Sequence, residues 1–308
     1  MKGKLGPFRL APWFSPRPWG RKDLRPWYES TGTAEKVGEA WLTGPQSVVE
    51  TGALAGQTLA AVAAESAEAL LGATNGAEFP LLVKLLFPSD KLSVQVHPDD
   101  AHAQSMGQPR GKTECWYVLE AEPGATIMLG LKPGTTVDTV RTAIANGTLE
   151  EWMEFVPVTA SDMVFVDAGT VHAIGPGVVL LETQQTSDTT FRMYDYGRPR
   201  ELHVEQALRV MKTHTAAGKV QPVKMDGYTR LIAQKYFVVD RYDVAAGCEA
   251  VIPIAEPGCL VGLGGSAKVI GAGEVELPQG QAVVVPASVG EVKVRSEAGA
   301  SFVRCFAP

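Results

Sequence analysis

The stretch KLSVQVHPDD, residues 91–100, indicates how this chain folds. Apolar and polar residues alternate along it, which is the pattern of a half-buried β-strand. The apolar positions share one face of that strand, and Ser93, Gln95 and His97 share the other. Because the protein is otherwise aliphatic, a hydroxyl, an amide and an imidazole in one row are expected to face a site inside a β-barrel.

Composition sets the limits around this strand. The chain has 308 residues, of which 45% are hydrophobic and 20% are charged, as expected of a soluble globular protein with one large domain or two modest ones. The net charge of −6 argues against a nucleic-acid partner but is compatible with a small anionic substrate.

Membranes and export are not expected for this sequence. It contains no apolar run of about 18 residues, so no transmembrane helix is predicted, and its first 20 residues lack the apolar core of a signal peptide. The four cysteines show no paired metal-binding spacing and are expected to be reduced thiols of a cytoplasmic protein. They are Cys115, Cys248, Cys259 and Cys305.

Short strands dominate the remaining pattern, and they predict a mainly β protein built as a sandwich or barrel. The apolar segments that turn residues separate are 80–87, 91–97, 113–120, 125–130, 155–157, 163–167, 178–183 and 190–196. Helices are expected over 57–71 and 201–212, with a helical insertion over 135–155. Short strands return after residue 227 and indicate a second, smaller β unit. The expected domains are therefore 1–212 and 213–308.

Two side chains outside the opening strand complete a candidate metal site. His172 follows an apolar strand, and Glu114 lies two residues after Lys112, on the same face. Together with Gln95 and His97 they offer nitrogen and oxygen donors, which suit Zn²⁺ or another divalent first-row ion and leave coordination positions open for catalysis. The alternative is that each histidine is an ordinary buried polar residue with a hydrogen-bond partner.

A second cluster follows His172. Glu182 lies within an apolar strand, and a carboxylate in that position is expected to be either paired or functional. One interpretation is a structural ion pair with Arg192, ten residues later. The other is that Glu182 and Arg192 are acid–base and charge-stabilising groups beside the metal.

Four segments together resemble the type I mannose-6-phosphate isomerases, in particular the short bacterial form. They are FPLLVKLLFPSDKLSVQVHPDD, GKTECWYVLE, DAGTVHAIGPG and LETQQTSDTTFRMYDYGR. The resemblance implies a cupin fold of jelly-roll barrels and one divalent metal, usually zinc. It assigns the metal ligands to Gln95, His97, Glu114 and His172. Ala40 departs from the family, in which many members carry Ser.

The resemblance also implies an activity and residues for it. The reaction is the interconversion of mannose 6-phosphate and fructose 6-phosphate by proton transfer between C2 and C1 through an enediolate. Arg192, Lys112 and Glu182 would be the catalytic groups, and the sequence does not rank Glu182 against Lys112 as the acid–base residue. Lys84, Ser93 and Arg198 are expected to bind the phosphate.

Other cupin functions are compatible with parts of the pattern. The main alternative is a non-catalytic cupin that binds sugar phosphates, and another metal-dependent cupin enzyme is a third possibility. All four ligand positions are intact, which favours the isomerase. The expected partner is a small sugar phosphate, and the chain is expected to be a monomer or a homodimer.

Overall fold

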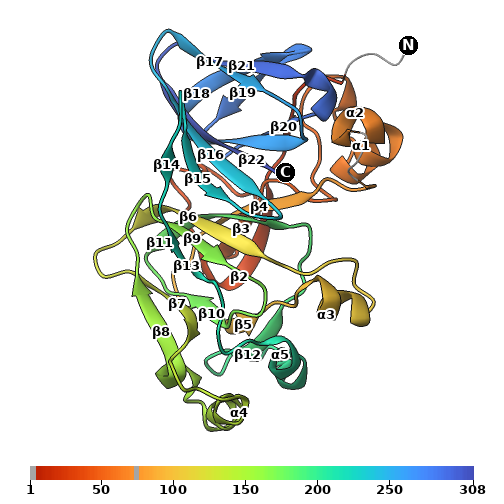
Figure 1. The fold of residues 1–308 in the computed structure, drawn as a ribbon. Helices are drawn as coiled ribbons and strands as arrows, with labels where there is room; N and C mark the ends of the chain where they lie inside the picture. The colour runs from red at the N-terminus through yellow and green to blue at the C-terminus, as the bar shows by residue number, and fades with distance from the viewer. Residues whose placement is uncertain (1–4, 73–75) are drawn as a thin grey trace.

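The residues described by the structure, a computed structural model covering 5–72 and 76–308, form three antiparallel sheets (Figure 1). The seven strands of the central sheet run in the order β13 (Gly218–Val220), β9 (Met163–Val166), β6 (Glu114–Ala121), β11 (Val178–Gln185), β4 (Leu81–Leu86), β3 (Val37–Trp41) and β2 (Trp13–Arg21). A five-stranded sheet contains β12 (Phe191–Tyr194), β5 (Val94–Val96), β10 (His172–Ile174), β7 (Thr126–Leu131) and β8 (Met153–Pro157). The mainly β architecture expected from the sequence is confirmed.

The C-terminal sheet has ten strands and curls around its own core. Its members are β1 (Phe8–Leu10), β14 (Val223–Lys224), β15 (Thr229–Ala233), β16 (Val238–Val244), β17 (Cys248–Pro253), β18 (Gly258–Gly271), β19 (Gly273–Pro278), β20 (Ala282–Val285), β21 (Glu291–Ser296) and β22 (Ala300–Phe306). This is the second β unit that the sequence predicts.

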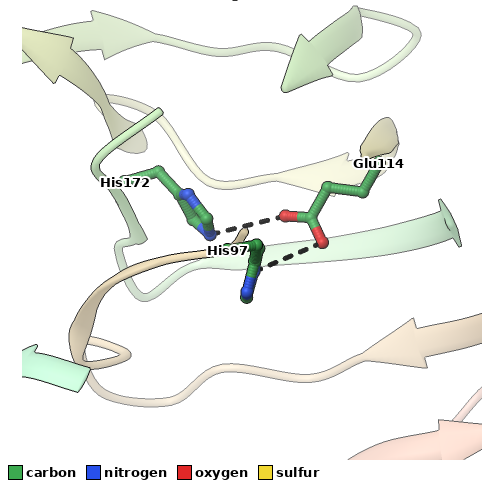
Figure 2. A group of neighbouring side chains, drawn as sticks. All are labelled: His97, Glu114 and His172. Carbon is green, nitrogen blue, oxygen red and sulfur yellow. Dashed lines mark ion pairs between the residues drawn. The ribbon is translucent and has the colours of Figure 1, made fainter. Parts of the chain in front are cut away.

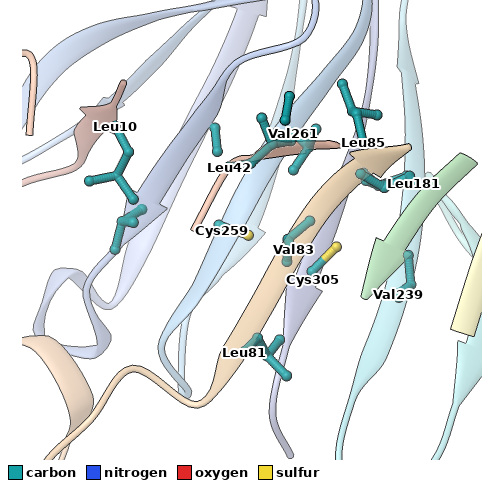
Figure 3. Close-up of a cluster of buried hydrophobic side chains, with 14 of the residues drawn as sticks. Leu10, Leu42, Leu81, Val83, Leu85, Leu181, Val239, Cys259, Val261 and Cys305 are labelled. Carbon is teal, nitrogen blue, oxygen red and sulfur yellow. The ribbon is translucent and has the colours of Figure 1, made fainter. Parts of the chain in front are cut away.

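The strands of the central sheet are buried on both faces, which is why they read as apolar runs. In β4, Leu81, Val83 and Leu85 face the C-terminal sheet, and Figure 3 shows them packed toward Val261 and Cys305. The opposite face of the central sheet packs on the five-stranded sheet through a second apolar cluster. A polar side chain on that inner face, such as Lys84, is therefore enclosed between two sheets.

Helices are few and short in the described part of the chain. They are α1 (Leu59–Glu65), α2 (Ala67–Leu71), α3 (Asp100–Ser105), α4 (Val137–Asn146) and α5 (Val204–Val210), with 3-10 turns at Gly52–Leu54, Leu149–Trp152 and Ala287–Val289. None of them has the length and apolar character needed to span a bilayer. Helices α4 and α5 cover the outer face of the five-stranded sheet.

The single helix expected over 57–71 is instead two helices. Ser66 has non-helical backbone angles and separates α1 from α2. The break allows both helices to bury apolar residues, including Val62 and Leu70, in the core between the central and C-terminal sheets. Helices α4 and α5 lie within the expected ranges, whereas α3 was not predicted, and Gly147 ends α4 in the left-handed conformation.

Two strands cross the expected domain boundary at residue 212. The N-terminal strand β1 pairs with β20 of the C-terminal sheet, and β13 pairs with β9 at the edge of the central sheet. Each part of the chain therefore supplies a strand to a sheet of the other part. The division into the domains 1–212 and 213–308 remains a prediction.

Candidate metal centre and cavity

Three buried side chains converge between the central and five-stranded sheets. His97 Nε2 lies 3.6 Å from one oxygen of Glu114, and His172 Nε2 lies 3.4 Å from the other (Figure 2). Their candidate ligand atoms all lie within 4.8 Å of one another. The sequence expectation that these three residues meet in space agrees with this geometry.

Backbone carbonyls orient both imidazole rings. His97 Nδ1 lies 2.9 Å from the carbonyl oxygen of Thr189, and His172 Nδ1 lies 2.9 Å from that of Thr170. Since Nδ1 must be the protonated nitrogen to donate there, Nε2 of each ring keeps its lone pair and faces Glu114. This tautomer is the one required of a metal ligand.

The group also has unsatisfied polar atoms. Within the described ranges, His97 Nε2 and Glu114 Oε1 are buried and have no hydrogen-bond partner. Burial lowers the pKa of His97 well below its usual range and that of His172 to about 4, which keeps both rings neutral at pH 7. Buried polar atoms without partners are rare, and a cation at their common focus would satisfy them. The residues therefore fit one divalent metal ion.

Gln95 lies next to this group. Its side chain Nε2 is 3.3 Å from His172 Nε2, and its Oε1 is 3.4 Å from Ser93 Oγ. The strand register explains the placement, since Gln95 pairs with His172 on one side and with Arg192 on the other. The polar row of the opening strand thus faces the inside of the barrel.

The central sheet contributes a matching row of charged residues. Glu182 of β11 lies opposite Lys84 of β4 in the strand register, and their charged atoms are 3.6 Å apart. Lys112 Nζ lies 3.0 Å from Glu114 and 3.7 Å from Glu182. Asp188 adds a further carboxylate 3.2 Å from Lys84. The metal group is thereby connected to a buried network of alternating charges.

Two pKa shifts distinguish the members of this network. Burial raises the pKa of Glu182 above its ordinary value. Burial would lower the pKa of Lys112, but the carboxylates of Glu114 and Glu182 outweigh it and raise that pKa. Lys112 therefore stays protonated, whereas Glu182 holds a proton more readily than an exposed glutamate.

The network opens into a cavity of about 440 Å³. This volume lies in the range of about 300–1,000 Å³ that is typical of small-molecule sites. Nine of the ten predicted site residues line this cavity or form the metal group behind it, and Arg198 does neither.

The two interpretations of Glu182 and Arg192 can now be separated. Among the described residues no ion pair joins them. Glu182 pairs with the two lysines, and Arg192 Nη1 donates to the carbonyl oxygen of Glu201. Arg192 Nε is buried without a hydrogen-bond partner in the described part of the chain. The structural ion pair is therefore not formed.

Arg198 lies outside the cavity because other groups hold it. Its guanidinium pairs with Asp90 at 2.7 Å and with Asp195 at 3.1 Å, and it donates to the carbonyl oxygen of Lys91. Arg200, two residues later, lines the cavity instead. The geometry does not support Arg198 as a phosphate ligand.

Sequence reasoning missed four charged cavity residues, Arg17, Glu39, Asp188 and Arg200. Arg17 and Glu39 form a two-bonded pair, with both N···O distances at 3.0 Å. Ala40, the family departure, faces the apolar core, so it lies on the opposite face of β3 from Glu39. The alternation around Glu39 could have identified a polar position facing the site, but nothing in the sequence predicts its arginine partner.

Comparison with known proteins gives the family. The family model described as the catalytic domain of type I phosphomannose isomerase matches residues 8–127. A mannose-6-phosphate isomerase from Streptococcus mutans is 35% identical over 88% of this chain and 89% of its own length. The chain belongs to the mannose-6-phosphate isomerase family. The resemblance carried by the four segments is thereby confirmed, and so is the expectation of an enzyme.

Further members of the family agree over the full length. The mannose-6-phosphate isomerase ManA of Bacillus subtilis is 34% identical over 95% of this chain and 96% of its own. A crystal structure of the mannose 6-phosphate isomerase from Bacillus subtilis superposes with a TM-score of 0.88 at 29% identity, covering 98% of this chain and 100% of that one. The cupin fold expected for this isomerase family is confirmed.

Proposed function

We propose that the protein interconverts D-mannose 6-phosphate and D-fructose 6-phosphate. The observation that carries the proposal is the buried His97, Glu114 and His172 group, whose unsatisfied atoms lie beside an acid–base pair in one cavity. A non-catalytic sugar-phosphate binder would not require a buried glutamate with a raised pKa next to a metal group.

We assign the metal to zinc, with Gln95 as the fourth ligand. Two imidazoles and a carboxylate are typical zinc donors and leave room for substrate oxygens. Binding the ion in this way would require the side-chain amide of Gln95 to be flipped, so that Oε1 faces the ion and Nε2 faces Ser93. When bound, the ion supplies a Lewis acid that polarises the C1 and C2 oxygens of the open-chain sugar.

Glu182 is the group that we propose moves the proton between C2 and C1. Its raised pKa brings it closer to neutrality, as a general base requires. Lys112 is a poor base because its pKa is raised, so its protonated amine would stabilise negative charge on the sugar oxygens. These opposite roles rest on the raised pKa values of Glu182 and Lys112, two residues that the sequence left unranked. A hydride shift would need no such base.

Arg192 would add a fixed positive charge at the cavity wall. Its guanidinium has no carboxylate partner among the described residues and keeps an unsatisfied Nε. Such a group can stabilise an enediolate oxygen without having to leave an existing ion pair. Lys84 and Ser93 line the same cavity and remain candidates for binding the phosphate.

The location and assembly expected from the sequence stay predictions. We propose a cytoplasmic protein, and the free thiols of all four cysteines are compatible with a reducing compartment. We propose that it is a monomer or a homodimer, two states that sedimentation measurements distinguish.

The test is a coupled assay for fructose 6-phosphate formed from mannose 6-phosphate. Protein stripped with a chelator should lose activity and regain it with zinc, and the His97→Ala variant should stay below about 1% of wild type, since it removes a ligand on which the ion depends. Zinc content, measured by mass spectrometry, should fall in parallel. A folded, zinc-loaded wild type without turnover would refute the proposed function.

A further inference from the structure

The side chains that line the cavity carry an excess of positive charge. The cations are Arg17, Lys84, Lys112, Arg192 and Arg200, and the carboxylates are Glu39, Glu182 and Asp188. A phosphate monoester carries about −1.5 to −2 charges at pH 7, which is opposite in sign to this excess, although Glu114 and Asp195 behind the lining pair with Lys112 and Arg200 and reduce it. Which residues carry the excess positive charge depends on the carboxylate neighbours of each cation.

The lysines are not its source. Lys84 lies within 4 Å of both Glu182 and Asp188, and Lys112 lies within 4 Å of Glu114 and Glu182. Each ammonium group therefore already has two carboxylate neighbours. A phosphate bound by either lysine would have to compete with those carboxylates for the same ammonium group.

The arginines are less completely neutralised. Arg192 has no carboxylate partner in the described ranges. Arg200 holds Asp195 with two bonds of 2.6 and 2.7 Å, but Asp195 is shared with Arg198. Glu39 is the one carboxylate among the described residues that pairs with Arg17, and it also accepts a hydrogen bond from Trp41. The excess positive charge thus belongs to the arginine side of the cavity.

These three guanidinium groups are neighbours. The positive charges of Arg200 and Arg17 both act on Arg192 and, after burial, contribute to the lowering of its pKa. Like charges gathered at one cavity wall are costly unless an anion joins them. Their carboxylate partners hold Arg17 and Arg200 in fixed orientations, so each can present its remaining N–H groups to a ligand.

We propose that Arg17 and Arg200, which line the same cavity as Arg192, bind the phosphate group of the sugar and make the enzyme specific for phosphorylated substrates. Arg17 lies in β2 and Arg200 lies in the segment after β12, so the two residues come from parts of the chain that are far apart in sequence. The inference rests on the proposed function, because it takes the ligand to be a sugar phosphate.

The experiment uses inorganic phosphate as a probe that needs no turnover. Its dissociation constant is measured by calorimetry on the full-length, zinc-free protein, and its inhibition constant on the zinc enzyme. Arg17→Gln and Arg200→Gln should each raise the dissociation constant for phosphate about tenfold or more. Each should also raise KM for mannose 6-phosphate by a larger factor than it lowers kcat. Arg17→Lys, which keeps the charge but loses the fork, should have a smaller effect.

Two further variants make the result interpretable. Arg25→Gln removes an exposed arginine that follows β2 and pairs with Asp23. This variant should leave the dissociation constant for phosphate within about twofold of wild type. Arg198→Gln removes the competing candidate, which also contacts Asp195. Melting temperatures identify any variant that fails to fold, and Arg17→Lys then replaces Arg17→Gln.

The outcomes separate the two proposals. If Arg198→Gln or Lys84→Met weakens inorganic phosphate while both Arg17 and Arg200 variants bind it normally, the assignment to Arg17 and Arg200 is overturned. If the Arg17 and Arg200 variants lose phosphate binding but the zinc-loaded wild type does not isomerise mannose 6-phosphate, the site stands and the proposed function falls.

Discussion

Glu182 is the residue on which the chemistry of the cavity depends. It lies opposite Lys84 in the sheet, within 4 Å of the charged atoms of Lys84 and Lys112. Replacing it with Gln leaves Asp188 beside Lys84 and Glu114 beside Lys112, so neither lysine loses its last carboxylate neighbour. The fold should therefore survive a substitution that removes the proton carrier.

We expect Glu182→Gln to lower kcat by about 100-fold or more, as is usual for loss of a general base. The raised pKa also predicts a pH effect on stability. The folded protein holds this proton more tightly than the unfolded chain, so the stabilisation is present below an unfolded pKa of about 4.3 and is lost as pH rises through the folded pKa. Relative to wild type, the variant should gain stability as pH rises.

Urea unfolding of the two proteins at several pH values measures that difference, and the coupled assay measures kcat. A variant that keeps more than about a tenth of wild-type kcat would exclude Glu182 as the base. A difference in unfolding free energy that does not change with pH would show that the carboxyl has no raised pKa in the fold.

At the scale of elements, the connection from β5 through α3 to β6 positions the site. A Cβ at Gly111 would lie 2.4 Å from the carbonyl carbon of Asp99 and 2.5 Å from the carbonyl oxygen of Pro98. The next residue, Lys112, donates its backbone N–H to that same oxygen at 2.9 Å. Only glycine permits this approach, which determines where Lys112 and Glu114 enter the sheet.

Gly111→Ala should therefore displace the start of β6. We expect a loss of about 1–3 kcal/mol in the free energy of unfolding, as for other overpacked sites, and weaker zinc binding because Glu114 moves. Gly218→Ala is the control, since a Cβ there meets nothing within 4 Å and its backbone is not left-handed. Equal effects of the two substitutions on zinc affinity would contradict the argument.

Elements and site differ in how far the sequence predicts them. The period of two between Gln95 and His97 identifies both the strand and its polar face, because a strand places alternate residues on one side. The break at Ser66 depends on the apolar core that α1 and α2 cover. The pairing of Arg17 with Glu39 depends on the contact between two strands. Local sequence does not encode these partners, and for the same reason it does not show that Arg198 pairs with Asp90 and Asp195 outside the cavity that Arg200 lines.

At the scale of the whole molecule, one apolar core joins the central and C-terminal sheets. It contains residues from β1, β4 and β22, among them Leu10, Val83 and Cys305 (Figure 3). Removing residues 213–308 would expose this face of the central sheet, leave β1 without β20 and uncover the edge of β9. An exposed apolar sheet with open edges favours aggregation.

The fragment 1–212 is therefore expected to be insoluble, or to lack a cooperative thermal transition, although it contains every predicted site residue. Circular dichroism and calorimetry of the fragment beside the full chain measure this. A fragment that melts cooperatively within about 10 °C of the full chain would show that 1–212 is an independent domain, as the sequence predicts.

The pairing of β1 with β20 also has a consequence for how the protein is made. The ribosome synthesises Phe8–Leu10 long before Ala282–Val285, the strand that pairs with it. Contacts between such distant segments close large loops and slow folding. The nascent chain must therefore keep β1 unpaired until β20 has been made, and chaperones that shield apolar segments would have most to contribute during that interval.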